Sequence, residues 1–116
     1  MTRSLVFALI VAVVSVASCS TTDSTSPSCD TPARTTTIDM QDVAFAPDCV
    51  AASAADTLSL VNHDQMAHTY TVKGTSINVD IDPGQTAQAP LSGTAPGTYS
   101  VFCTYHPSMT ASLQVT

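Results

Sequence analysis

The feature that most constrains the fold is a succession of short β-favouring runs from Arg34 onward, with turn residues between them. No segment in this part of the chain keeps a helical hydrophobic period for long, whereas clusters of Pro, Gly, Asn and Asp recur between the runs. This pattern predicts an all-β domain of seven to eight short strands. That many strands in one small domain favour a two-sheet sandwich with Greek-key connections. A turn or so of helix is expected around residues 50–55.

Individual strands are expected where apolar and polar residues alternate. Residues 57–62 and 68–73 are expected to form a strand pair, with Leu58 and Leu60 on the same face. Other expected strands are residues 77–81, residues 98–103 with Tyr99, Val101 and Cys103 on one face, and residues 111–115 with Ala111, Leu113 and Val115 inward.

The N-terminus has the pattern of an export signal. Arg3 supplies a positive start, and residues 5–17 form an apolar run without a charge. The run is shorter than the roughly 20 residues that a permanent membrane helix needs, so cleavage is expected. The sequence Val16-Ala17-Ser18-Cys19 that follows resembles the lipobox of bacterial lipoproteins, in which the chain is cut before a Cys that carries a diacylglycerol. The resemblance implies lipidation of Cys19; the alternative is an ordinary secreted protein with a free Cys19.

These features divide the chain into three parts. Residues 1–18 are expected to be a signal peptide, residues 19–33 a lipidated Cys with a Ser- and Thr-rich tether, and residues 34–116 the folded domain. The protein is therefore expected outside the cytoplasm, anchored to the cell membrane on its periplasmic or cell-surface face. All nine acidic residues are Asp, and the net charge of −6 argues against nucleic acid and against electrostatic adhesion to anionic lipid.

The segment that carries the chemistry is Cys103-Thr104-Tyr105-His106-Pro107-Ser108-Met109, directly after an expected buried strand. A thiolate, an imidazole and a thioether together suit copper, because sulfur stabilises Cu(I) and imidazole accepts both oxidation states. His68 opens a strand far upstream and is the expected fourth ligand. His68, Cys103 and His106 with Met109 in the axial position would form a His₂Cys trigonal set with a weak axial thioether.

On these residues the chain resembles the cupredoxins, and among them the amicyanins and plastocyanins. The residues that carry the resemblance are Asn62-His63-Asp64-Gln65-Met66-Ala67-His68, the ligand segment from Ala95-Pro96-Gly97 to Met109, and Val43-Ala44-Phe45-Ala46-Pro47. The resemblance implies one type 1 copper ion and single-electron carriage without enzymatic turnover. It also implies a monomer that docks transiently with redox proteins around His106, with Pro107, Tyr105 and Met66 nearby.

Two positions depart from the family's usual pattern. Thr69 follows His68 where Asn is more common, and Tyr105 stands where amicyanins tend to have Pro. The first departure concerns the hydrogen bond that ties the two ligand segments together. The Thr69 hydroxyl is expected to reach the backbone or the side chain of Thr104 instead.

Met109 and some residues near the expected ligands also have simpler interpretations. Met109 can be core filling, a role that suits Met, and Met66 is a rival for the axial position. His63 is expected to be a solvated turn residue and Asp64 a solvated surface charge.

The number of cysteines leaves several pairings open. Three cysteines remain beyond Cys19, and an odd number in an oxidising compartment leaves one free, metal-bound or paired with another molecule. Pairing of Cys29 with Cys49 leaves Cys103 for copper, whereas a disulfide from Cys103 to either of the others excludes the metal. Two rival functions follow: a carrier or buffer that delivers copper, and a metal-free structural or adhesive lipoprotein.

Overall fold

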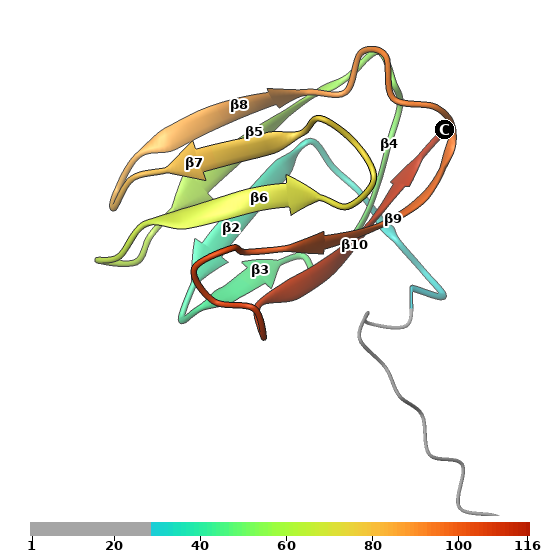
Figure 1. The fold of residues 1–116 in the computed structure, drawn as a ribbon. Helices are drawn as coiled ribbons and strands as arrows, with labels where there is room; N and C mark the ends of the chain where they lie inside the picture. Colours follow the sequence, from blue (N-terminus) through green and yellow to red (C-terminus); the bar gives the residue numbers. More distant parts are fainter. Residues whose placement is uncertain (1–28) are drawn as a thin grey trace, which may run out of the picture.

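A computed structural model describes residues 29–116, and every regular element in this part of the chain is a β-strand (Figure 1). The all-β prediction is confirmed. The described residues form ten strands rather than seven to eight, because the short β1 and β3 add to the longer ones. The strands are β1 (Ala33–Arg34), β2 (Thr37–Gln41), β3 (Ala44–Ala46), β4 (Cys49–Ala52), β5 (Thr57–Asn62), β6 (His68–Val72), β7 (Asn78–Ile81), β8 (Thr86–Pro90), β9 (Gly97–Phe102) and β10 (Thr110–Val115).

The strands form two mixed sheets that enclose one core. The six-stranded sheet has the order β1-β4-β10-β9-β6-β7, and the four-stranded sheet has the order β3-β2-β5-β8. Three neighbouring pairs are parallel: β1 with β4, β4 with β10, and β2 with β5. Strands that follow each other in sequence therefore often lie in different sheets, as in a Greek-key sandwich.

The expected pairing of residues 57–62 with residues 68–73 is wrong. Both segments are strands, but β5 pairs with β2 and β8 while β6 pairs with β7 and β9 in the other sheet. The five residues between them are too many for a two-residue hairpin loop. They carry the chain from one sheet to the other and deliver His68 to the start of β6.

The helical turn expected around residues 50–55 is also absent. Residues 49–52 form β4, which lies between β1 and β10 and pairs with both. Although alanine favours helix, the two parallel neighbours satisfy the backbone of this segment on both sides and override that preference.

The core lies between the sheets and depends on the alternation seen in the sequence. Leu58 and Leu60 are fully buried from β5, and Leu113 is fully buried from β10. The faces expected for these strands are confirmed. The buried cluster comprises Ile38, Met40, Phe45, Val50, Ala52, Leu58, Leu60, Tyr70, Val72, Ile81, Ala89, Leu91, Val101, Cys103, Met109, Ala111, Leu113 and Val115.

The loops that carry the expected ligands meet at one end of the sandwich. The segment before β6 and the loop from β9 to β10 both lie on the left in Figure 1, beside the turn between β2 and β3. This end is called the ligand end below. It is formed by residues 42–43, 62–68 and 103–109.

Several predictions concern residues outside the described part. The signal peptide, Cys19 and residues 20–28 of the expected tether lie outside it. Within residues 29–116, no helix is long and apolar enough to cross a membrane.

Candidate metal centre

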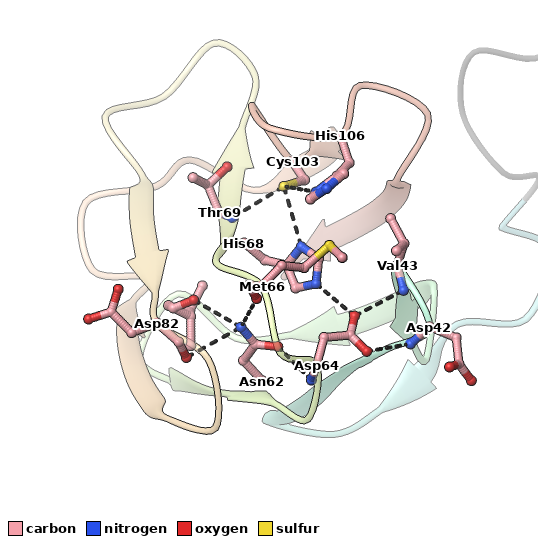
Figure 2. A network of polar contacts seen from close by, with 11 residues as sticks. Asp42, Val43, Asn62, Asp64, Met66, His68, Thr69, Asp82, Cys103 and His106 are labelled. Atoms are coloured by element: carbon pink, nitrogen blue, oxygen red, sulfur yellow. Dashed lines mark hydrogen bonds and ion pairs between the residues drawn. The ribbon is translucent and has the colours of Figure 1, made fainter.

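Three of the predicted ligands converge at the ligand end (Figure 2). Cys103 Sγ lies 3.8 Å from His68 Nδ1 and 3.7 Å from His106 Nδ1. The two imidazole rings meet edge to face, with their centroids 5.0 Å apart. One nitrogen from each ring and the sulfur therefore face a common point.

The β9–β10 loop places two of these ligands through a tight turn. The carbonyl of His106 accepts the N–H of Met109 at 2.8 Å, so residues 106–109 close a four-residue turn. Pro107 occupies the second position of this turn, where its fixed φ is favourable. The N–H of Cys103 donates to the carbonyl of Met109 at 3.1 Å and closes the base of the loop. The short spacing thus lets one small loop present both His106 and Cys103.

The donor atoms fit a transition-metal ion. Three ligands at about 2.1–2.3 Å from a central ion lie about 3.6–4.0 Å from one another if they surround it as a triangle. The two sulfur–nitrogen distances fall in that range, and all three atoms lie within 4.8 Å of one another. Two imidazoles and one thiolate in trigonal arrangement are the donor set of electron-transfer copper sites. The residues present therefore fit one copper ion.

Thr69 ties the two ligand segments together. Its backbone N–H points at Cys103 Sγ over 3.3 Å, which places a donor on the sulfur. Its hydroxyl accepts the Thr104 N–H at 2.8 Å and lies 3.2 Å from the Thr104 hydroxyl. Thr69 and Thr104 therefore contact each other where the two ligand segments meet.

Asp64 is not the solvated charge expected from the sequence. One carboxylate oxygen lies 2.7 Å from His68 Nε2, and only 13% of the side chain is exposed. The carboxylate also accepts the backbone N–H groups of Asp42 and Val43 at 2.8 and 3.0 Å. The hydrogen bond from Val43, more than any other contact, lowers the pKa of Asp64 below its ordinary value. The prediction of a solvated Asp64 is wrong because the fold brings the β2–β3 turn against this carboxylate (Figure 2).

Asn62 is a second site residue that the sequence analysis missed. Its buried amide donates to the carbonyls of Met66, Ile81 and Asp82, at 2.8, 3.0 and 3.3 Å. Its side-chain oxygen accepts the N–H of Asp64 at 3.0 Å. Asn side chains commonly accept the N–H two residues ahead and so form a turn. The Asn-x-Asp spacing therefore could have indicated this turn. Asn62 fixes the segment that delivers His68.

The remaining candidates lie around the centre. Met109 is buried on the same loop, and Met66 is 45% exposed. His63 is a half-exposed turn residue, as expected, and its Nε2 lies 2.8 Å from an oxygen of Asp39.

Cys103 carries a free thiol, whereas Cys29 and Cys49 are joined in the structure. The Cα atoms of Cys29 and Cys49 lie 5.6 Å apart, a usual separation for a disulfide. Of the pairings that the sequence leaves open, the structure thus has the one that keeps Cys103 beside the two histidines.

Comparison with known proteins agrees with this geometry. A family model described as a cupredoxin-like domain matches residues 6–115. This chain belongs to the cupredoxin-like family. No curated protein matches its sequence significantly.

Solved structures share the fold at low sequence identity. A purple cupredoxin from Nitrosopumilus maritimus is 14% identical, with a TM-score of 0.56 over 69% of this chain and 98% of that one. A reduced amicyanin variant is 22% identical, with a TM-score of 0.57 over 69% of this chain and 80% of that one. A copper-containing nitrite reductase from Thermus scotoductus is 21% identical, with a TM-score of 0.59 over 69% of this chain. This chain spans only 22% of the length of that reductase. These likenesses establish the cupredoxin fold.

Proposed function

We propose that this cupredoxin is a single-electron carrier with one mononuclear copper centre, which would be held by His68, Cys103 and His106 with Met109 as the fourth ligand. The observation that carries the proposal is the convergence of Sγ and one nitrogen from each ring within 4.8 Å of one another, with the two Nδ1 atoms 3.8 and 3.7 Å from the sulfur. A copper ion bound there would supply a one-electron couple between Cu(II) and Cu(I). Met109 is buried and follows His106 in the same turn, which supports its role as the fourth ligand.

The contacts around the donor atoms favour fast electron transfer. The Thr69 N–H holds the sulfur, Asp64 holds the His68 ring, and the turn at residues 106–109 holds His106. All of these contacts are made by protein groups without a bound ion. The protein therefore imposes nearly the same positions on the ligands in both states, and little rearrangement accompanies the arrival of an electron.

The surface at the ligand end supports docking of a redox protein. Among the described residues, the exposed large hydrophobic side chains are Val43, Met66 and Tyr105, and each lies in one of the three segments of this end. We call these three residues the apolar rim. His106 is partly exposed among them, so we propose that electrons pass through its ring. Redox encounters use small interfaces, so a few exposed side chains can be enough for docking.

Burial of the ligands favours electron carriage over copper delivery. His68 and Cys103 are both 0% exposed, so an acceptor protein has no access to them for a stepwise exchange of ligands. The four proposed ligands leave no position for a substrate. We therefore propose that the protein is not an enzyme and keeps its copper through many cycles.

We further propose that the protein acts outside the cytoplasm as a monomer, anchored by lipid on Cys19, with residues 1–18 removed. The tether expected over residues 19–33 would then end before Cys29, because Cys29 is joined to Cys49 and Ala33 lies in β1. A disulfide between Cys29 and Cys49 is consistent with an oxidising compartment. The reductive cytoplasm would not maintain such a bond.

The test compares electron exchange with copper loss in the full-length copper protein, purified in detergent. Line broadening in NMR spectra of mixed oxidised and reduced protein gives the rate of electron self-exchange, and a competing chelator gives the rate of copper loss. We expect electron exchange to be faster by orders of magnitude. Met66→Lys should slow self-exchange because it places like charges in the rim contact, while copper loss stays unchanged.

Thr98→Lys is the matched control, because it adds the same charge at the exposed far end of β9. It should leave self-exchange almost unchanged. Copper loss that outpaces electron exchange would instead favour the copper carrier.

A further inference from the structure

Asp64 links the buried ligand His68 to the opposite sheet. The carboxylate lies 2.7 Å from Nε2 of the ring, while Nδ1 of the same ring faces Cys103 Sγ at 3.8 Å. A carboxylate accepts hydrogen bonds and has no proton to give when ionised, so the proton between the two groups belongs to Nε2. The Nδ1 lone pair is then directed at the metal position.

The carboxylate is itself held in place by a turn of unusual conformation. Asp42 and Val43 form the two-residue connection between β2 and β3, and their φ angles are +54° and +58°. Two positive φ values are typical of a type I′ hairpin turn, but a branched side chain such as Val is unfavourable there. Both N–H groups of this turn donate to Asp64. The turn thus aims two donors at the carboxylate from the other sheet and fixes its orientation.

We propose that Asp64 is a positioning residue for the metal centre, which holds His68 in the tautomer that binds through Nδ1 and lowers the reduction potential through its negative charge. The proposal rests on the copper site proposed above. Carboxylates that accept the second N–H of a ligating histidine commonly orient the ring and increase its basicity. A negative charge stabilises Cu(II) more than Cu(I), because the oxidised ion carries the larger positive charge.

The surroundings of Asp64 leave its charge without a competing cation. Both basic residues of the described part, Arg34 and Lys73, lie in β1 and directly after β6, at the end opposite the ligands. His63 neighbours Asp64 in sequence, but its ring contacts Asp39 instead. Within residues 29–116, the side-chain hydrogen bond of this carboxylate is to His68, and its other two hydrogen bonds come from backbone N–H groups.

The central experiment compares Asp64→Asn with wild type in the full-length chain. Asn keeps the shape and one oxygen acceptor but loses the charge and one of the hydrogen bonds. One electron from the electrode reduces Cu(II) to Cu(I). We expect the equilibrium between the two oxidation states to lie at least about tenfold further toward Cu(I) in the variant than in wild type. This shift corresponds to a rise of about 59 mV in the reduction potential of a one-electron couple. Affinity for Cu(II) should fall about 10- to 100-fold.

Asp39→Asn is the matched control. It removes the same charge and a contact to a half-exposed histidine, His63, rather than to a ligand. Solvent screens an exposed charge, so the potential of this variant should stay close to that of wild type. Equal potentials for Asp64→Asn and wild type, or equal rises in the two variants, would overturn the electrostatic part of the proposal.

A second measurement needs neither copper nor a variant. In the metal-free wild type at mildly alkaline pH, nitrogen-15 NMR of the histidine rings should show His68 with its proton on Nε2 and slow exchange of that proton with water. A proton on Nδ1, or a mixture of tautomers, would overturn the positioning role. Because this reading uses the metal-free protein, it decides the role of Asp64 even if the chain forms no thiolate–copper band and the proposed function fails.

Discussion

The hydroxyl of Thr69 is the single group whose removal should most clearly separate the two ligand segments. Thr69 is 2% exposed, and its hydroxyl accepts the Thr104 N–H at 2.8 Å. Thr69→Val keeps the branched shape, so it creates no cavity, but it leaves that N–H without its partner. An unpaired buried donor costs about 1–3 kcal/mol. Because Thr104 itself is exposed and water can replace part of the bond, we expect a loss of about 1–2 kcal/mol in the free energy of unfolding.

Two assays on the metal-free protein check this estimate. Urea unfolding should give the loss directly, and a domain of this size should melt about 5–15 °C lower, since each kcal/mol shifts the melting temperature by about 4–8 °C. Hydrogen exchange should show the Thr104 amide exchanging about 5- to 30-fold faster, because about 1.4 kcal/mol corresponds to a factor of ten.

Thr69→Ser is the control for this prediction. It retains the hydroxyl and loses only a methyl group, which costs about 0.8 kcal/mol, so the Thr104 amide should stay protected while stability falls slightly. A Thr104 amide as well protected in Thr69→Val as in wild type would mean that the Thr69 hydroxyl does not hold this N–H.

Three further changes have defined outcomes. Met109→Leu keeps the core volume, so the free energy of unfolding should change by less than about 1.5 kcal/mol. Voltammetry of this variant should show a higher reduction potential than wild type, and the control Met66→Leu should not. Replacing both Cys29 and Cys49 by Ala opens a loop with a sequence separation of 20, and urea unfolding should show a loss of about 3 kcal/mol; no loss would mean that the bond is absent. Burial raises the pKa of Tyr70, so its phenol resists ionisation in the folded state. The unfolded state loses this proton first, so stability is retained below about pH 10 and falls above it, and Tyr70→Phe should weaken that alkaline fall in pH-dependent unfolding.

The sequence predicts well those features that depend on local pattern. Alternation along β5 and β10 identified both strands and the buried faces of Leu58 and Leu60. The short spacing from Cys103 to His106 predicted two ligands on one loop, because only a tight turn separates them.

Features that depend on long-range pairing were not predictable in the same way. β4 is alanine-rich and forms a strand because β1 and β10 lie on either side of it. Residues 57–62 and 68–72 are close in sequence yet lie in different sheets, since strand alternation says nothing about pairing partners.

The role of Asp64 was hidden for the same reason. Its contact with His68 requires a particular loop conformation, and two of its hydrogen bonds come from the β2–β3 turn, more than 20 residues away. An acidic residue in a turn between strands is most often solvated, so only the three-dimensional arrangement distinguishes this one.

Visible absorption during titration of the full-length chain with Cu(II) shows whether Cys103 is the thiolate ligand of a copper site. Cys103→Ser, which replaces the sulfur with oxygen at a buried position, is titrated beside it. Wild type should show an intense blue thiolate-to-copper band that saturates at one equivalent, and the variant should lack this band. A colourless wild-type protein, with Cys103 either titratable as a thiol or found in a disulfide, would contradict a copper site with Cys103 as its ligand.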